Sequence, residues 1–376
     1  MKKIGIITFH RANNYGAVLQ AYALMLACRE FGDAVIIDYD DTYINSEYNT
    51  IRPLRKKQFI KSLIKTAMDC FCFRKRSKRR KAFDNFRNKY LATTKRIDDM
   101  NSLKIEAKEF DYVITGSDQV WSPVITDGIS DIYFMSFASG NTKKISYAPS
   151  VGNAKQLKPF EEKVKELLSD YVAISVRESD AQEYLSNLLK KDVEQVVDPV
   201  LLIEKETWKE LLKDNDKKTD EKYIFAYSVS YSPECTKIAN HLSTKEGMPI
   251  IHAEQIKKTY RNTLRTIVTE GPIGFINAIK NAEYVVTSSF HATVFSIIFH
   301  KKLIVIPHRK TGIRVVNLLS RCGIADRVYY TLEEFIERNN YANSPAWTLV
   351  DKRIDAMRKQ SKIWLKSSLE KGDLLK

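Results

Sequence analysis

His291 stands where a catalytic side chain is expected in an open α/β sheet. It follows a β-branched and aromatic run at residues 284–286, which suits a buried strand, and three hydroxyl residues at 287–289. The apolar spacing predicts a helix at residues 290–300 and a second buried strand at 303–306. His291 is therefore expected in the first turn of a helix, at the carboxyl end of a strand. Parallel sheets bind their ligands at that edge, and helix N-termini attract anions.

Two polar turns follow other predicted strands. The loop at residues 9–16 carries Asn13 and Asn14, for which turn geometry and ligand binding are both open explanations. The loop lacks the GxGxxG pattern, and this excludes NAD and FAD as cofactors. The second turn follows a strand at 111–114 and offers three hydrogen-bonding side chains, Ser117, Asp118 and Gln119.

Arg177 lies at the end of a strand predicted at residues 171–176. It is expected to be either an anion clamp or one half of a surface pair with Glu178, and the strand-end position favours the clamp. No two histidines in the sequence have the spacing of metal ligands, so no bound metal is expected.

Strands alternate with helices along both halves of the chain, which predicts an α/β protein with two Rossmann-like, doubly wound domains. The highly charged segment 211–221 is expected to be the exposed linker between them. The domains are thus expected at residues 1–210 and 222–350, with a basic helical insertion at about 50–96 in the first. An amphipathic C-terminal helix within residues 351–376 is expected to cross back to the first domain.

The composition is that of a soluble globular protein, with 376 residues of which 44% are hydrophobic and 28% charged. No apolar run approaches the roughly 20 residues that a transmembrane helix needs. The N-terminus leads straight into a core strand at 4–7 and shows no secretory signal. The five cysteines are odd in number and have no paired spacing, so free thiols and a cytoplasmic location are expected.

The net charge of +15 is concentrated in one segment. Residues 52–96 hold 17 Lys or Arg and only two acids, Asp69 and Asp84. The first half of this segment, at 59–71, has helical apolar periodicity, whereas residues 74–81 are almost purely cationic. The pattern suits either an anionic membrane surface or a helical excursion whose basic face is solvated. Nucleic acid is not expected as a partner, because no recognised binding motif accompanies the charge.

Eight short motifs occur in order along the chain. They are N-N-Y-G-A-V-L-Q-A-Y-A-L at 13–24, G-S-D-Q-V-W at 116–121, Y-A-P-S at 147–150, V-R-E-S at 176–179, D-P-V at 198–200, G-P at 271–272, S-F-H-A at 289–292 and R-V-V-N-L-L at 314–319. Each motif is modest alone, but as an ordered set they resemble the polysaccharide pyruvyl transferase family. The resemblance covers about residues 4–327 and leaves out the basic insertion and the C-terminal tail.

This resemblance implies a GT-B-like fold, with two α/β domains facing each other across the active-site cleft. Members of the family transfer the enolpyruvyl moiety of phosphoenolpyruvate onto two sugar hydroxyls as a ketal and release phosphate. The chain is therefore expected to act on a sugar of a cell-surface glycan or its precursor, with phosphoenolpyruvate as co-substrate and no further cofactor. Because phosphoenolpyruvate carries a phosphate and a carboxylate, its site needs cationic groups and backbone N–H donors.

The resemblance also implies roles at the donor. His291 matches the family histidine and is expected to act as the general acid that protonates the vinyl carbon. Arg177 matches a family arginine that grips the donor, and Ser288 lies in the same turn as the histidine. Better-known members have arginine where this chain has Ser289, as R-x-H. Either a nearby cation replaces that arginine, or the donor is not phosphoenolpyruvate; the candidates are Arg309, Lys310 and Arg314.

On the acceptor side, Asp118 is expected to be a second catalytic residue that orients the sugar hydroxyls. The expected acceptor-binding residues are Asn13, Asn14, Tyr15, Ser117 and Gln119. If the acceptor is lipid-linked, the basic insertion would hold the protein at the inner face of the membrane. Two other functions stay open at this point: a GT-B-type glycosyltransferase that uses a nucleotide sugar, and a non-catalytic relative. The sequence does not predict an oligomeric state.

Overall fold

The computed structural model describes residues 1–53, 59–215, 220–253, 260–308 and 312–371. The chain divides into two compact units. Unit 1 comprises residues 1–203 and 357–376, and unit 2 comprises residues 204–356. Helix α10 (Lys205–Leu212) belongs to unit 2, where the buried Trp208 ring packs edge-on against Phe295 at 5.0 Å. The boundary predicted at residue 210 therefore falls inside this helix, and the unit begins earlier than the linker at 211–221.

Within the described residues, unit 1 contains a six-stranded sheet in the order β2-β1-β3-β4-β5-β6, and each strand pairs parallel with its neighbour. The strands are β1 (Lys2–Ile7), β2 (Gly32–Ile36), β3 (Tyr112–Thr115), β4 (Lys143–Ser146), β5 (Tyr171–Val176) and β6 (Val193–Gln195). The chain runs outward from β1 to β2 and then returns to β3 on the other side of β1. The strand order therefore reverses between β1 and β3, which is where open α/β sheets bind their ligands.

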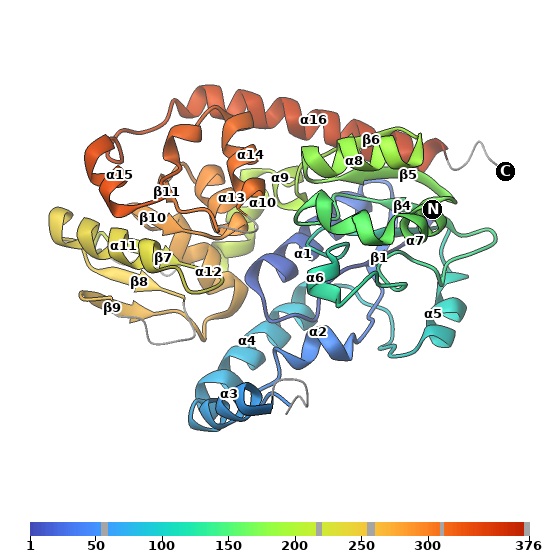
Figure 1. Cartoon of the computed structure of the whole chain (residues 1–376), viewed down its shortest axis with the longest axis horizontal. Coiled ribbons are helices and arrows are strands. Elements are labelled where there is room, and N and C mark those ends of the chain that lie inside the picture. The colour runs from blue at the N-terminus through green and yellow to red at the C-terminus, as the bar shows by residue number, and fades with distance from the viewer. Residues whose placement is uncertain (54–58, 216–219, 254–259, 309–311, 372–376) are drawn as a thin grey trace. The chain divides into compact units, whose positions relative to one another are not determined.

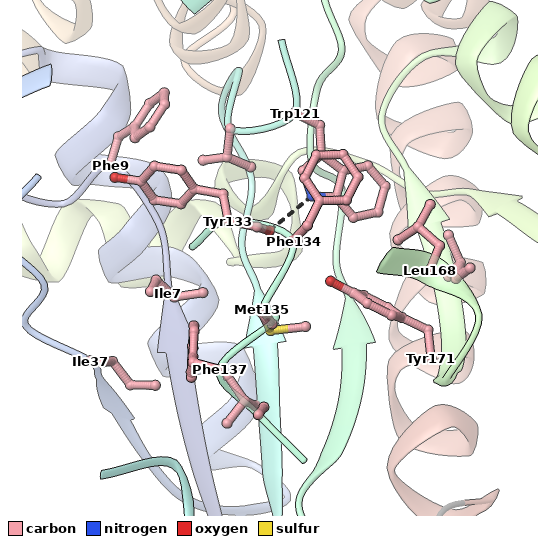
Figure 2. Packing of buried hydrophobic residues seen from close by; sticks show 14 of the residues in the cluster. Ile7, Phe9, Ile37, Trp121, Tyr133, Phe134, Met135, Phe137, Leu168 and Tyr171 are labelled. Carbon is pink, nitrogen blue, oxygen red and sulfur yellow. Dashed lines mark hydrogen bonds between the residues drawn. The ribbon is translucent and has the colours of Figure 1, made fainter. Parts of the chain in front are cut away.

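Helices make the connections of unit 1 (Figure 1). They include α1 (Tyr15–Arg29), α2 (Thr42–Ser46), α3 (Phe59–Phe71), α4 (Phe73–Tyr90), α5 (Met100–Ala107), α6 (Pro123–Thr126), α7 (Glu161–Leu168), α8 (Ser179–Leu189) and α9 (Pro199–Leu202). Aromatic side chains fill the core on one face of the sheet (Figure 2). There the Trp121 ring stacks on the Phe134 ring at 4.8 Å. The Trp121 indole N–H donates to the Tyr133 carbonyl at 3.0 Å, so the buried indole has its hydrogen bond.

In the described part of unit 2, five parallel strands follow the order β11-β10-β7-β8-β9. They are β7 (Ile224–Tyr227), β8 (Ile250–His252), β9 (Thr263–Thr266), β10 (Tyr284–Thr287) and β11 (Lys302–Val305). The helices are α10, α11 (Pro233–Glu246), α12 (Gly271–Lys280), α13 (Phe290–Ile298), α14 (Ile313–Cys322) and α15 (Leu332–Arg338). Because β7, β8 and β9 run one way and β10 returns to the other side of β7, the reversal in this sheet lies between β7 and β10.

The last helix, α16 (Trp347–Lys371), starts in unit 2 and ends in unit 1. Its later residues are bonded into unit 1: the Leu369 carbonyl accepts from Lys2 Nζ at 2.8 Å and from the Tyr112 hydroxyl at 2.6 Å. The Ser361 hydroxyl accepts from the Val197 N–H at 3.1 Å. In the described part of the chain no helix is long and apolar enough to cross a bilayer.

The predicted α/β class, with a doubly wound parallel sheet in each half of the chain, is confirmed. The bounds predicted for α13 and β11 agree with the observed ones to within two residues. The helix predicted at 290–300 is observed as Phe290–Ile298, and the strand predicted at 303–306 as Lys302–Val305.

Candidate functional site

Helix α13 begins directly after β10, and a small hydrogen-bond network fixes the turn between them. Thr287 Oγ1 donates to the Tyr227 carbonyl of the neighbouring strand at 2.6 Å and accepts from the Ser289 N–H at 3.0 Å. The Ser289 hydroxyl then accepts from the Ala292 N–H at 3.3 Å, as the N-cap of α13. This arrangement places His291 in the first turn of the helix, at the carboxyl end of β10.

His291 is buried, with 8% of its surface exposed, and its ring lies edge-on to the Phe290 ring at 5.3 Å. The guanidinium carbon of Arg314 lies 6.0 Å from the centre of that same Phe290 ring. Arg314 belongs to the first turn of α14 and is half-buried. The structure therefore brings the predicted histidine and one of the predicted donor-binding cations close to the same aromatic ring.

The two serines of the turn have different surroundings. Ser289 is buried and its hydroxyl caps α13, so its first role is to position the histidine's helix. Ser288 is half-buried, and its N–H donates to the Tyr227 carbonyl at 3.2 Å. Arg309, which was also predicted to bind the donor, lies outside the described residues, as does Lys310.

Ser228 is a further polar residue of this edge that the sequence prediction missed. It follows β7 directly, and β7 pairs with β10 so that Tyr227 lies opposite Thr287. Ser228 is buried, and among the described residues its hydroxyl has no hydrogen-bond partner. Buried hydroxyls normally have a partner, so one without a partner at the reversal point of a sheet is a candidate ligand contact.

The charge of this region gives a sequence signal that was also missed. Residues 284–325 contain no Asp or Glu but hold six Lys or Arg and three His. This run includes β10, α13, β11 and the whole of α14. Only part of this run lies at the carboxyl edge of the sheet, where it includes His291 and Arg314. Lys302 lies at the opposite end of β11 and pairs with Glu283 at 2.7 Å. Cations without neighbouring acids at the carboxyl edge favour the binding of an anion there.

At the corresponding edge of unit 1, Arg177 is enclosed by carboxylates. Its Nη1 donates to Asp198 Oδ2 at 2.8 Å and its Nε lies 3.4 Å from Glu178 Oε1. The side chains of Arg177, Asp198 and Glu178 are only 4%, 0% and 2% exposed. Burial alone would lower the pKa of Arg177, but the charges of Glu178 and Asp198 raise it above its ordinary value.

This geometry excludes one of the two roles that the sequence left open for Arg177. Arg177 and Glu178 do not form a surface pair, because both side chains are buried. The alternative, an anion clamp, would have to compete with two carboxylates that already face the guanidinium. The role of Arg177 in gripping the donor thus stays a prediction, and the contacts in the structure are those of a buried ion-pair network.

Ser117 and Ser150 complete this network. The Ser117 hydroxyl lies 3.0 Å from Asp198 Oδ2, and the Ser150 hydroxyl donates to Glu178. Asp198 also caps α9 by accepting from the Val200 N–H at 3.0 Å. Ser117, predicted to bind the acceptor, is therefore buried and engaged with a carboxylate of its own unit.

Asp118 and Gln119 lie at the margin of this network and are half-buried. Asp118 has a φ of 78°, which is unfavourable for a residue other than glycine, and its carboxylate accepts from the Gln119 N–H at 2.8 Å. Its carbonyl accepts from the Ser150 N–H at 2.7 Å, which ties the strained turn to the next strand end. Strained residues of this kind cluster at functional sites, so Asp118 remains a candidate.

The loop at residues 13–15 is covered by the basic insertion. The Asn14 side chain caps α1 by accepting from the Gly16 and Ala17 N–H groups at 2.9 and 3.3 Å, which favours the turn explanation for this residue. The Asn13 amide accepts from Arg87 at 2.9 Å, and the Tyr15 hydroxyl bonds Arg79 at 2.6 Å. All three predicted acceptor-binding residues of this loop thus have partners inside unit 1.

A second ion cluster lies after β1 and β2 and was not predicted. His10 Nε2 and Arg11 Nε lie 2.7 and 2.6 Å from Asp38 Oδ1, and Arg11 Nη2 lies 2.6 Å from Asp38 Oδ2. Burial alone would raise the pKa of Asp38, but the hydrogen bonds from His10 and Arg11 hold it well below its ordinary value. The signal that could have found it is the placement of a His-Arg pair and an aspartate just after two neighbouring strands.

No three His, Cys, Asp or Glu side chains of the described ranges gather as a metal site would require. The expectation of no bound metal stays a prediction.

Comparisons with known proteins place the chain by family and by fold. The model of the polysaccharide pyruvyl transferase family matches residues 14–310. No curated protein matches the chain in sequence. Among solved structures, UDP-GlcNAc 2-epimerase from Neisseria meningitidis, bound to UDP-GlcNAc, is similar over 99% of this chain and 100% of its own, with 12% identity and a TM-score of 0.53.

Two further structures agree with this similarity. S. aureus MnaA, solved with UDP, covers 93% of this chain and 90% of its own at 10% identity and a TM-score of 0.53. The UDP-GlcNAc 2-epimerase of Methanocaldococcus jannaschii covers 91% of this chain and 93% of its own at 11% identity and a TM-score of 0.50. At such identities the likeness concerns the fold alone, and it confirms the predicted GT-B-like α/β architecture.

Proposed function

Because the chain belongs to the polysaccharide pyruvyl transferase family, we propose that it transfers the pyruvyl group of phosphoenolpyruvate, as a ketal, onto a sugar of a cell-surface glycan or its precursor and releases phosphate. Membership makes the chain one of a family of transferases. The donor, the ketal product and the class of acceptor are the proposal.

The observation that carries the proposal is the position of His291. It lies in the first turn of α13, at the point where the sheet of unit 2 reverses its strand order, within a run of 42 residues that contains no acid. Phosphoenolpyruvate presents a phosphate and a carboxylate, and both groups are stabilised by cations and by the positive end of a helix. A proton donor placed beside an anion site is the arrangement that this reaction needs.

The proposed reaction assigns one proton transfer to His291. Its imidazolium gives a proton to the vinyl CH₂ carbon of phosphoenolpyruvate, which becomes a methyl group and leaves C2 electrophilic. One sugar hydroxyl attacks C2 and loses its proton, which restores the protonated imidazole. The C2–O bond to phosphate then breaks, and the second hydroxyl attacks C2 to close the ketal while its proton leaves with the phosphate. The overall reaction consumes phosphoenolpyruvate and two hydroxyls and needs no redox partner.

Better-known family members have an arginine at the position of Ser289. Arg314 is proposed to supply that positive charge in this chain. Its guanidinium carbon lies 6.0 Å from the centre of the Phe290 ring, which His291 also contacts, and it projects from the first turn of α14. The Ser228 hydroxyl would donate one hydrogen bond to the same anion. On the acceptor side, the half-buried Asp118 and Gln119 remain the proposed contacts for sugar hydroxyls. No cofactor is required beyond phosphoenolpyruvate as co-substrate.

The test is a thermal-shift titration with phosphoenolpyruvate, UDP-sugars and GDP-sugars. A ligand that binds only the native state stabilises it by about 2.7 kcal/mol at a concentration 100 times its Kd. Phosphoenolpyruvate should raise the melting temperature of the wild type, and this rise should shrink in Arg314→Ala. Arg321→Ala is the matched control, because Arg321 is a half-buried arginine at the other end of α14.

Ser289 favours one alternative, a glycosyltransferase that takes a nucleotide sugar, because the position that differs from the family belongs to the donor site. Stabilisation by a nucleotide sugar and not by phosphoenolpyruvate would support that alternative and overturn the proposed donor. Stabilisation by none of these ligands, together with the absence of phosphate release from phosphoenolpyruvate, would favour a non-catalytic relative.

A further inference from the structure

Helix α3 turns its polar side inward and its apolar side outward. Ser62 and Asp69 are buried, at 6% and 2% exposed, and Thr66 on the same side is half-buried. The opposite side carries four large exposed apolar residues, Leu63 at 49%, Ile64 at 56%, Met68 at 49% and Phe71 at 94%. A surface helix of a soluble protein normally has the reverse orientation, so a contiguous exposed apolar face indicates a partner.

A buried ion pair fixes this orientation. Asp69 accepts from the Arg52 N–H at 3.0 Å, from Arg52 Nε at 2.8 Å and from Arg52 Nη2 at 2.7 Å. Arg76 lies 3.3 Å from the same carboxylate, and the Thr66 hydroxyl bonds the Arg52 carbonyl at 3.0 Å. Turning the helix to bury its apolar side would expose these groups or leave them unpaired. The outward apolar face is thus a built feature of the segment.

Helix α4 continues from α3 and is held to the body of unit 1. At their junction the Cys72 N–H bonds the Met68 carbonyl at 2.9 Å. The Phe83 ring packs against Tyr15 at 5.2 Å and Phe86 against Tyr22 at 5.9 Å, while Arg79 bonds the Tyr15 hydroxyl. The interpretation of the insertion as a packed helical excursion therefore fits α4, and it does not fit α3. Both helices are light blue in Figure 1.

The start of α4 places cations next to the apolar face of α3. Phe73, the first residue of α4, is 48% exposed, and the exposed cations that follow it are Arg74, Lys75, Lys78, Arg80 and Lys81. Within the described ranges, the acid paired with one of these cations is Asp84, at 3.8 Å from Arg80. The first turns of α4 therefore keep most of their positive charge unneutralised.

We propose that the apolar face of α3 and the cations at the start of α4 form a docking surface for an anionic lipid bilayer. Interfacial helices insert an apolar face to a shallow depth while Lys and Arg beside it attract anionic headgroups, and both features are present on neighbouring turns here. A second copy of the chain is a poorer occupant, because pairing the two faces would bring the same cations together. A bilayer supplies both the apolar interior and the opposite charge.

The experiment measures binding of the full chain to vesicles of phosphatidylcholine alone and of phosphatidylcholine with phosphatidylglycerol. The wild type should bind the anionic vesicles with an affinity at least tenfold higher than its affinity for the neutral vesicles. Leu63→Ser/Ile64→Ser/Phe71→Ser should weaken binding to anionic vesicles at least tenfold, whereas Ile105→Ser, an exposed isoleucine on α5, should not. Lys75→Glu/Lys78→Glu/Lys81→Glu should weaken it similarly, and Lys108→Glu/Lys155→Glu/Lys158→Glu is the matched control of exposed lysines.

A reporter keeps the test decisive if a multiple variant folds poorly. Phe71→Trp introduces an exposed indole whose emission should shift to the blue with anionic vesicles and be quenched by brominated lipid. The proposal would be overturned if the apolar variant bound anionic vesicles as the wild type does, whether or not the cation variant lost binding. It would also be overturned if the emission of the introduced indole did not shift. A concentration-dependent dimer that disappears in the apolar variant would overturn it as well, because the face would then belong to a second copy.

Discussion

Both sheets gather polar side chains at the carboxyl ends of their strands, but the charges are arranged differently in the two units. In unit 1 the cations at this edge already face carboxylates: Arg177 meets Asp198 and Glu178, and Arg11 with His10 meets Asp38. In unit 2 the part of the edge that follows β10 and reaches α14 holds hydroxyls, His291 and Arg314, in a run without acids. The cations of the unit 1 edge are paired with carboxylates. The region around His291 in unit 2 has no acid in its own run of sequence, so its positive charge is available to an anionic ligand.

The difference separates two functions that look alike in a sequence. A buried ion-pair network fixes the turns that carry it, and removing one partner leaves a charge without compensation. An acid-free cationic edge gains little from its own neighbours and is stabilised when an anion binds. Substitutions in the two ion-pair networks of unit 1 should therefore act mainly on stability, and those around His291 mainly on turnover and donor affinity.

The largest effect is expected from Arg177→Ala. It would leave Asp198 and Glu178 buried without their cation, which costs roughly 3–5 kcal/mol in free energy of unfolding. Urea denaturation followed by circular dichroism measures this loss. Lys209→Ala, which removes an exposed partner of Glu206, is the control and should change stability by about 0–1 kcal/mol. If Arg177→Ala kept its stability and raised the KM for phosphoenolpyruvate instead, the guanidinium would be a donor clamp and the comparison would fail.

The next effect is expected at His291, in turnover. His291→Gln removes the proposed general acid and should lower kcat by roughly 10²–10⁴-fold, with the melting temperature close to that of the wild type. Phosphate release from phosphoenolpyruvate in the presence of a glycan acceptor measures it. His300→Gln changes a histidine just beyond the other end of α13, bonded to Asp351 at 2.9 Å, and should keep kcat within about threefold. Equal losses in both variants would mean that neither histidine acts chemically.

The comparison also shows which features a sequence can predict. The strands and the helix around His291 were predicted from the sequence with bounds close to the observed ones. Buried strands and a buried helix each have a characteristic local spacing of apolar residues. Arg314 was proposed for another reason, as one of three cations that could replace the family arginine at position 289, and the structure places it in the first turn of α14. The structure then adds Phe290 as the ring that both residues contact.

What the sequence could not predict depends on partners far along the chain. Arg177 is paired with Asp198, 21 residues later, and Asn13 with Arg87, 74 residues later. The inward side of α3 is set by Arg52 and Asp69, 17 residues apart, so apolar periodicity predicted the helix but not the side that faces water. In each case a long-range charge or hydrogen bond decides between explanations that local spacing leaves equal.

A smaller effect is expected at Arg314. Arg314→Lys keeps the charge but loses the planar donor pair, and should raise the KM for phosphoenolpyruvate about tenfold with kcat nearly unchanged. Arg314→Ala should raise it further. Steady-state kinetics at fixed acceptor separates the two constants, and Arg321→Lys on the same helix should leave both unaltered. A fall in kcat with an unchanged KM would instead give Arg314 a role only in the transition state.

The smallest effect is expected on acid stability, at the ion cluster that Asp38 forms with His10 and Arg11 in unit 1. Hydrogen bonds from His10 and Arg11 hold the pKa of Asp38 below the ordinary value of about 3.9, in spite of its burial. A carboxyl whose folded pKa is depressed stabilises the fold above its unfolded pKa and loses that contribution as the pH falls. The difference in free energy of unfolding between wild type and Asp38→Asn should therefore be largest above about pH 5 and shrink as the pH falls below about 4.

Urea denaturation at several pH values measures this difference, with Asp33→Asn as the control because Asp33 is exposed on β2, the strand that precedes Asp38. A difference that stays constant from pH 7 to pH 3 would mean that His10 and Arg11 do not stabilise the ionised carboxylate. The edge of unit 1 would then hold charges that are adjacent without being coupled. In that case the contrast with the acid-free edge around His291 would rest on Arg177 and its two carboxylates alone.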